Sequence, residues 1–309
     1  MSADDSSALA SGITWDLSDL FSSPKDPKIA ETWAECHARA DAFAAAYRGR
    51  AESGSLSASE LAEALAEIES LTQEAAKAPS YASLLFAGDA SNPENGAFYQ
   101  AQSEESSSLS VKLAFFDLEL QAAQEDWINS VLADPALANY VHAIQVTRVY
   151  SPHRLSEAEE ILLEETSNTG SRAWTRLHDE ILSNHAFALI DPATGEAIEL
   201  SQEEVLHRLK SPDRAMRQAA ADSLSKGLSD LSRVIVFIYN TLLADKKLED
   251  RLRRFSYPEQ SRHMANELTE EIVDLVANLC RDNSGMVARY YNAKRELLGL
   301  EELTHVDRY

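Results

Sequence analysis

The chain has 309 residues, enough for one large domain or two ordinary ones. Hydrophobic residues make up 44% and charged residues 26%, a globular composition that excludes wholesale disorder and a fibrous repeat. Against 51 acidic residues stand 28 Lys and Arg, and the resulting formal charge of −23 disfavours nucleic acid and anionic membrane surfaces as partners.

Cysteine usage and the chain start indicate a cytoplasmic protein. Cys36 and Cys280 are far apart and show no ligand spacing, so neither a disulfide framework nor a zinc knuckle is predicted. The acidic stretch Met1–Asp5 lacks the basic and apolar regions of an export signal. The longest apolar run, Val234–Ile238, is far shorter than the roughly 20 residues that cross a bilayer, so we expect a buried helix segment there.

The composition predicts an all-α fold, because only ten glycines and nine prolines interrupt a chain rich in helix formers. The sequence predicts an extended arm over residues 1–26, and its aromatic side chains Trp15 and Phe21 are expected to pack against the helical domain that follows. Apolar residues at helical spacing then predict a first helix over residues 27–47. Together these features indicate an array of helical hairpins that starts with a docked arm.

Capping signals mark the next helices. Ser57 with Glu60 has the capping-box spacing, in which a hydroxyl and a carboxylate satisfy each other's backbone N–H groups. Ser156 with Glu159 repeats it, and the helix that follows carries acidic residues that complement the dipole of its first turn. Between them, one long helix is expected over residues 92–124.

One segment departs from the helical pattern and predicts a small β-hairpin over about residues 186–200. Two apolar runs flank Asp191–Gly195, where proline presets the turn and Gly195 takes the left-handed position. Ser201 with Glu204 is a third capping box and opens a short helix that ends near Lys210. We therefore expect an N-terminal helical domain over residues 27–210, hairpin included.

Residues 211–309 predict a further helical region. One long helix starts after Ser211-Pro212-Asp213 and tolerates Gly227, and two more cover about 269–281 and 284–298. No repeat of fixed period is found, which disfavours a solenoid.

Familiar catalytic patterns are absent from the sequence. It has no G-x-S-x-G elbow for serine hydrolysis, no glycine-rich phosphate loop, and no H-E-x-x-H or H-x-x-E-H zinc motif. Two E-x-x-H pairs, Glu204/His207 and Glu302/His305, have di-iron spacing, but neither falls in the middle of a long helix as a bundle core requires. No catalytic or metal-binding residue is assigned, no metal is expected to bind this chain, and the substrate-binding residues stay unknown.

Two weaker signals have ordinary structural interpretations. A basic cluster could hold an anion or a peptide terminus, but acidic residues interrupt it, so a solvated helix face with internal ion pairs is favoured. Its members are Lys246, Lys247, Arg251, Arg253 and Arg254, with Phe255 and Tyr257. His178 and His185 are two helical turns apart and are interpreted as structural histidines that share a face.

Several spaced motifs together resemble the oligoendopeptidase F family of zinc metallopeptidases, which are related to thimet oligopeptidase. They start with a W-x-L-x-x-L arm, the Asp191–Gly195 hairpin and the Ser201–Glu204 cap. The later motifs are Ser211–Arg217, Asn240–Lys246, Arg253–Pro258, Tyr290–Arg295, Leu298–Leu300 and Val306–Tyr309. The resemblance covers essentially the whole chain, but each motif belongs to the scaffold and none is catalytic.

The resemblance implies an intact enzyme that is an all-helical clamshell with zinc at the floor of a deep cleft that admits short unfolded peptides. In that family the H-E-x-x-H helix lies downstream of the position that corresponds to Tyr309. We therefore expect the chain to be the N-terminal half of such an enzyme, inactive alone, with residues 211–309 leading into a C-terminal catalytic half. The implied chemistry is zinc-assisted peptide hydrolysis, with zinc held by residues outside this sequence.

A second hypothesis assigns the same all-α fold to the chain but no peptidase activity. The chain would then be a stand-alone helical peptide-binding or scaffold protein related to such peptidases. The first hypothesis predicts exposed apolar surface where the catalytic half docks, because uncovered core faces are otherwise rare in a complete domain. The second predicts a monodisperse, stable chain.

Overall fold

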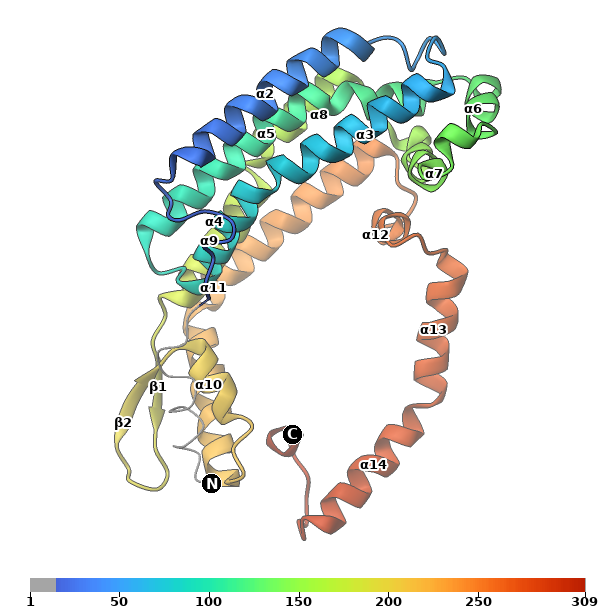
Figure 1. Cartoon of the computed structure of the whole chain (residues 1–309). Coiled ribbons are helices and arrows are strands. Elements are labelled where there is room, and N and C mark those ends of the chain that lie inside the picture. Colours follow the sequence, from blue (N-terminus) through green and yellow to red (C-terminus); the bar gives the residue numbers. More distant parts are fainter. Residues whose placement is uncertain (1–14, 309) are drawn as a thin grey trace. The chain divides into compact units, whose positions relative to one another are not determined.

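The computed structural model describes residues 15–308, and the expectations placed on Met1–Asp5 lie outside this range. The fold is all-α with one two-stranded antiparallel hairpin, as the sequence predicts (Figure 1). The α-helices are α2 (Pro27–Tyr47), α3 (Ala58–Ala75), α4 (Lys77–Gly88), α5 (Pro93–Ala122), α6 (Glu125–Leu132), α7 (Val141–Val149), α8 (Glu157–Ser167), α9 (Ser171–Ser183), α10 (Gln202–Arg208), α11 (Arg214–Arg253), α12 (Gln260–Ala265), α13 (Glu270–Asp282) and α14 (Ser284–Leu297). The strands are β1 (Phe187–Ile190) and β2 (Ala197–Leu200), and the 3-10 turns are η1 (Pro135–Leu137), η2 (Ser151–His153) and η3 (His305–Asp307).

The chain divides into two compact units, and α9 and α11 each contribute to both. In the described range, the first unit holds residues 177–241 and 259–308, and the second holds residues 15–176 and 242–258. The first unit therefore contains the hairpin and α12 to α14, while the second contains α2 to α8.

Helix α5 is the central element of the second unit, where α2, α4, α7 and α8 all contact it. Phe115 and Phe116 are buried on α5 and pack against Phe43 of α2, with ring centroids 6.0 and 5.1 Å apart respectively. A second buried cluster gathers around Trp33, whose indole Nε1 donates a hydrogen bond to Gln102 on α5. Aromatic burial on one long helix therefore holds the unit together.

The local signals in the sequence produce the predicted structures. All three capping boxes, at Ser57, Ser156 and Ser201, are formed with both of their hydrogen bonds. Gly195 has a φ of +76°, the left-handed conformation expected at the hairpin turn. The first helix spans the predicted residues, Pro27–Tyr47.

The arm before α2 docks only in part. Phe21 is buried against Tyr81, with ring centroids 5.6 Å apart, and Leu17 and Leu20 pack against the same cluster. Trp15 is 65% exposed, so the expectation that it docks is wrong. The apolar side chains nearer α2 satisfy the docking surface, and Trp15 lies beyond it.

The hairpin packs on the first part of α11 in the first unit. Phe187 is fully buried in a cluster with Leu189, Val205 and Ala220. A Cβ added at Gly227 would lie 2.4 Å from the Phe187 ring, so the glycine allows the close approach of hairpin and helix. Gly227 is thus required inside a helix of 40 residues.

The apolar run Val234–Ile238 in the middle of α11 is not a buried segment, which corrects the expectation from sequence. Ile238 is buried, but Val236 and Phe237 are 53% and 59% exposed. Only part of the run is therefore shielded from solvent in the described structure. Burial inferred from an apolar run assumes a partner on every side.

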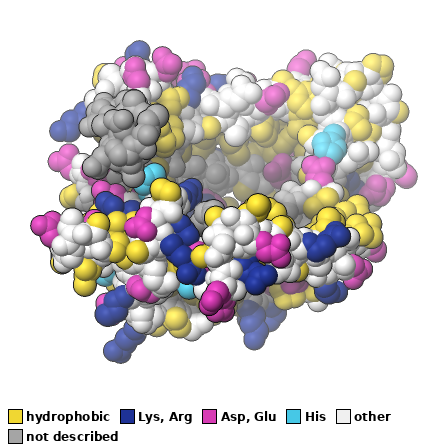
Figure 2. Space-filling model, turned by 90° about the horizontal axis from the view of Figure 1, so that it is seen from below, with side chains coloured by type: hydrophobic (Ala, Val, Ile, Leu, Met, Phe, Trp, Pro, Cys, Tyr) yellow, Lys and Arg dark blue, Asp and Glu magenta, His cyan; other side chains and the backbone are white. Residues whose placement is uncertain are grey.

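Helices α13 and α14 carry an even more open apolar surface. On α13, Ile272, Leu275, Val276 and Leu279 follow helical spacing on one face, and all four are exposed. On α14 the exposed apolar residues include Met286, Val287, Tyr290 and Leu297. Figure 2 shows hydrophobic side chains open to solvent among charged ones on the face that it draws.

Candidate functional sites

The described residues do not fit a zinc site. Across residues 15–308, no group of three or more His, Cys, Asp or Glu side chains lies close enough together to hold a metal ion. Glu204 is used by the capping box that opens α10, and Glu302 precedes the short turn η3. Neither E-x-x-H pair therefore lies on the inward face of a long helix, and no metal-dependent step is assigned to this chain.

The two histidines expected to share a helix face do not share a helix. His178 lies on α9, whereas His185 follows the end of that helix at Ser183. The His185 ring instead packs edge-on against Phe187, with ring centroids 4.7 Å apart. The expected structural role holds for His185, but the expected geometry is wrong because α9 ends two residues too early.

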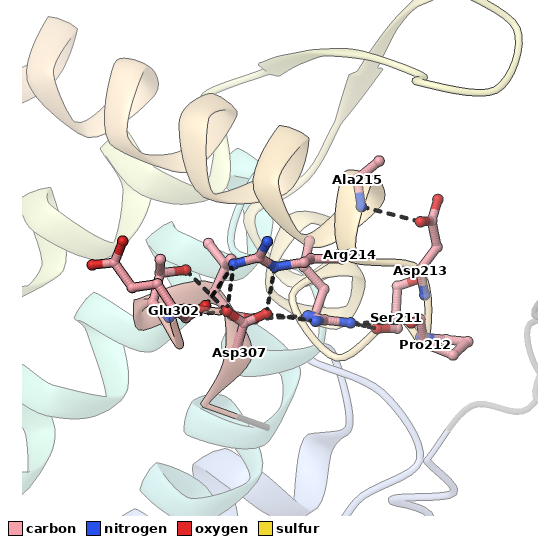
Figure 3. A network of polar contacts seen from close by, with 10 residues as sticks. Ser211, Pro212, Asp213, Arg214, Ala215, Glu302 and Asp307 are labelled. Atoms are coloured by element: carbon pink, nitrogen blue, oxygen red, sulfur yellow. Dashed lines mark hydrogen bonds and ion pairs between the residues drawn. The ribbon is translucent and has the colours of Figure 1, made fainter. Parts of the chain in front are cut away.

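A buried carboxylate, that of Asp307, accepts several hydrogen bonds where the segment after α14 meets the start of α11. Asp307 is fully buried, and the Arg214 guanidinium on α11 forms two hydrogen bonds of 2.9 Å with its two oxygens (Figure 3). Arg217 donates a further bond of 2.9 Å to Asp307 and one of 2.7 Å to the Val306 carbonyl. The backbone N–H and the hydroxyl of Thr304 donate two more bonds to Asp307, of 2.9 and 3.1 Å respectively. Charge-assisted bonds of this kind are about twice as strong as neutral ones.

This network holds the segment after α14 onto the start of α11. Hydrogen bonds from Arg214, and then those from Thr304 and Arg217, keep the pKa of Asp307 far below its usual range. Arg217 also donates to the carbonyls of Ser211 and Pro212, just before α11. The sequence shows these residues only as parts of family-like motifs, because the partners are about 90 positions apart and no local spacing links them.

A cavity of about 610 Å³ opens in the second unit between α3, α5, α8 and the end of α11. Its walls are mixed, with an apolar lining from several helices and five carboxylates against one guanidinium. The residues that shape it include Ile68, Val111, Leu113, Ala114, Asp117, Glu160, Ile161, Leu163, Glu164, Asp245, Leu248, Glu249 and Arg253. Its volume lies in the range of pockets that hold small molecules.

Arg253 supplies the positive charge in the lining of this cavity, and ion pairs hold its guanidinium in place. Its guanidinium forms bonds of 2.7 and 2.8 Å with the two oxygens of Glu160 on α8, and one of 2.8 Å with Glu249 on its own helix. The hydrogen bonds that Arg253 donates to Glu160 are the main cause of the raised pKa of its guanidinium. The Nδ1 of His153 donates to the Arg253 carbonyl at 2.8 Å, which anchors the same turn.

The predicted ion-paired helix face is confirmed for the basic cluster, since Lys246 pairs with Asp250 and Arg253 with Glu249. The bond from Arg253 to Glu160 joins residues 93 positions apart, so no local spacing in the sequence predicts it. The helix dipole accounts for only part of the acidic face of α8. The structure adds ion pairs to other elements, from Glu157 to Arg48 and from Glu164 to Arg172.

Asp117 of α5 lies where this cavity meets a second one of about 250 Å³. Solvent reaches the side chain, but the surrounding helices still desolvate the carboxyl group and raise its pKa. No hydrogen bond or ion pair to Asp117 is formed by any residue of the range 15–308, although Arg253 lines both cavities. Asp117 is therefore a carboxylate without a partner from the described residues, in a cavity whose guanidinium is already neutralised.

Helix α11 also meets a simple length and composition test for crossing a membrane. An 18-residue window has a mean hydropathy of 1.2, and 11% of it is buried. A single helix of this kind is weak support, because core helices of soluble proteins pass the same test. The expectation that the chain does not bind membranes stays a prediction.

Comparison with known proteins identifies relatives of one kind. Residues 119–187 match the family model described as Oligopeptidase F. The chain is 26% identical to Group B oligopeptidase PepB of Streptococcus agalactiae serotype III (strain NEM316) over 204 residues, which is 65% of this chain and 34% of that protein. It is 23% identical to oligopeptidase PepF of Bacillus subtilis (strain 168) over 316 residues, which is 99% of this chain and 45% of that protein.

Comparison with solved structures also identifies an oligoendopeptidase. The crystal structure of oligoendopeptidase-F from Enterococcus faecium superposes with a TM-score of 0.78 at 22% identity, covering 92% of this chain and 55% of that one. At this identity the superposition shows the common fold alone. The chain spans less than half the length of the two curated relatives, PepB and PepF. Sequence and fold together support the resemblance: the chain is similar to oligopeptidases of the oligoendopeptidase F kind.

Proposed function

We propose that the chain is the N-terminal scaffold and cleft-wall part of a zinc-dependent oligoendopeptidase that hydrolyses short peptides in the cytoplasm. Similarity to proteins named oligopeptidases, together with the family-model match over residues 119–187, supports the peptidase class. The observation that carries the proposal is the alignment with PepF, which includes 99% of this chain and only 45% of that protein. More than half of such a relative has no counterpart here.

In this proposal the catalytic groups belong to the remaining polypeptide. The sequence has no H-E-x-x-H motif, and residues 15–308 do not form a metal-binding group. The 309-residue chain alone is therefore expected to be inactive towards peptides. Its contribution is the shape of the cleft wall, which admits short unfolded peptides and excludes folded proteins.

The proposed partner of the chain is the C-terminal catalytic half. Helix α13 has the apolar face of a core helix, but all four of its apolar residues named above are exposed. Covering such a face contributes roughly 25 cal/mol for each Å² of apolar surface removed from water. Helices α13 and α14 are thus the surfaces on which the catalytic half is expected to pack.

The coding DNA tests this proposal directly when it is read in frame past the codon for Tyr309. We expect an H-E-x-x-H motif in the continuation, within a segment at least as long as this chain. An immediate stop codon would contradict the proposal and favour the stand-alone peptide-binding or scaffold protein. Peptide-binding assays would then replace peptidase assays.

A further inference from the structure

The cavity between α3, α5, α8 and α11 has an excess of negative charge that the chain itself does not balance. Glu160 and Glu249 are neutralised by Arg253, and Glu164 by Arg172. Asp117 and Asp245 line the same cavity, and neither forms a hydrogen bond or ion pair with another residue of the described range. Two carboxylates therefore face the cavity without a counter-ion.

Asp117 is the one whose pKa is raised by partial desolvation, although solvent still reaches its side chain. Both cavities border it, and no residue of the range 15–308 donates a hydrogen bond to it. Arg253 cannot serve as its partner, since the Nε, Nη1 and Nη2 of the guanidinium already bond to Glu249 and Glu160. A cation that enters the cavity can therefore form a charge-assisted hydrogen bond with a carboxylate that the described chain leaves available.

The rest of the lining defines what kind of cation fits. Ile68, Val111, Leu113, Ile161 and Leu248 provide apolar wall from four different helices. A hydrated metal ion would gain nothing from this lining, and no third ligand group is present in the described chain to coordinate it. A positive group attached to an apolar body matches both the charge and the wall.

We propose that this cavity binds a primary ammonium group carried on an apolar body, with Asp117 as its counter-ion. The ammonium donates charge-assisted hydrogen bonds to the Asp117 carboxylate, and the body lies against the apolar wall. Asp245 adds long-range attraction from the end of α11. The ammonium could be the N-terminus of a peptide or a free alkylamine, which share this chemistry. The inference depends only on the second unit and does not require the proposed peptidase function.

Titration calorimetry on the 309-residue chain tests the site with three probes. They are hexylamine, an apolar tripeptide amide with a free N-terminus, and the same tripeptide amide with an acetylated N-terminus. We expect at least one of the two amines to bind, and acetylation to weaken tripeptide binding about tenfold to a hundredfold, because a charge-assisted hydrogen bond is lost. Comparing hexylamine with the tripeptide amide shows which source of ammonium the cavity prefers.

Variants locate the binding. Asp117→Asn keeps the size of the side chain and should weaken amine binding about tenfold to a hundredfold. Asp274→Asn is the matched control, since Asp274 is exposed on α13 in the other unit and should leave binding unchanged. Ala114→Phe fills both cavities, which share Ala114, and should block binding while Asp117 stays in place.

The inference is overturned if neither amine binds at millimolar concentration. It is equally overturned if the acetylated and free tripeptides bind alike, or if Asp117→Asn binds amines as tightly as the parent chain. Circular dichroism of each variant shows that the fold is retained. Asp117→Asn should fold well, because it removes a charge that the structure does not compensate.

Discussion

Helices α5 and α13 both carry large apolar side chains, which are buried on α5 and exposed on α13. Helix α5 buries Phe115, Phe116 and Leu120 among α2, α3, α7 and other elements of the second unit. Helix α13 has an apolar face at helical spacing, and none of its residues is buried in the described structure. An apolar stripe therefore specifies a helix that needs a partner, but it does not say whether the partner lies within this chain.

The largest effect should come from Phe115→Ala. Phe115 is 1% exposed and packs against Phe43 and Phe116, so truncation leaves a cavity and should lower the free energy of unfolding by about 4 kcal/mol. Urea denaturation followed by tryptophan fluorescence measures the change. The matched truncation on α13, Leu275→Ala, should change stability by less than about 0.5 kcal/mol, since Leu275 is 58% exposed. Equal losses in the two variants would remove the contrast between the helices.

Asp307→Asn should have the next largest effect, because it leaves Arg214 and Arg217 without their buried counter-ion. A loss of about 3 kcal/mol is expected, seen as faster hydrogen exchange of the Val306 and Asp307 amides and of the first turn of α11. Unchanged exchange would show that the segment after α14 is held by other contacts.

The effect of Asp307→Asn on the free energy of unfolding should depend on pH. The folded state lowers the pKa of Asp307, so its stabilisation is fully present above the unfolded pKa of about 3.9 and declines as the pH falls below it. The stability gap between the parent chain and Asp307→Asn should therefore be smaller at pH 3 than at pH 6. A gap that widens on acidification would contradict the ion-pair account.

Gly227→Ala should cost about 2 kcal/mol, although alanine normally stabilises a helix. The new Cβ would lie 2.4 Å from the fully buried Phe187 ring, which has little room to move. Gly285→Ala on α14 is the control, because nothing lies within 4 Å of its Cβ position. Thermal melting should show a lower midpoint for the first variant and an unchanged or slightly higher one for the second.

The smallest effect on stability is expected on the open face of α13. Leu275→Glu should leave the unfolding free energy nearly unchanged but reduce the binding of an apolar dye, because the residue is half of an uncovered i, i+4 pair with Leu279. Ala277→Glu adds the same charge on the opposite side of α13 and should leave dye binding as it was. Equal dye binding in both variants would mean that this face is not the exposed apolar surface.

Local chemistry made much of this fold predictable from the sequence. The three capping boxes and the Asp191–Gly195 turn depend on residues three or four positions apart, and the structure forms them as expected. The Arg214–Asp307 and Arg253–Glu160 pairs were not predictable, because they join residues 93 positions apart in each case. Burial of Val236, Phe237 and Trp15 was predicted wrongly, since hydrophobicity shows a need for cover and not its presence.

Nothing in the sequence pointed to the cavity around Asp117. Its walls come from five helices, and an aspartate in the middle of a helix looks like any solvated acid. Its unusual state depends on Arg253 being already committed to Glu160, which only the folded chain reveals.

A peptidase assay on the natural gene product tests the proposal that this chain is the non-catalytic part of a zinc oligoendopeptidase. Hydrolysis of an internally quenched short peptide would be followed before chelation, after chelation and after zinc is restored, with the 309-residue chain measured in parallel. We expect cleavage by the natural product that is lost with the chelator and regained with zinc, and no cleavage by the 309-residue chain. Chelator-insensitive cleavage, or equal cleavage by the 309-residue chain, would rule the proposal out.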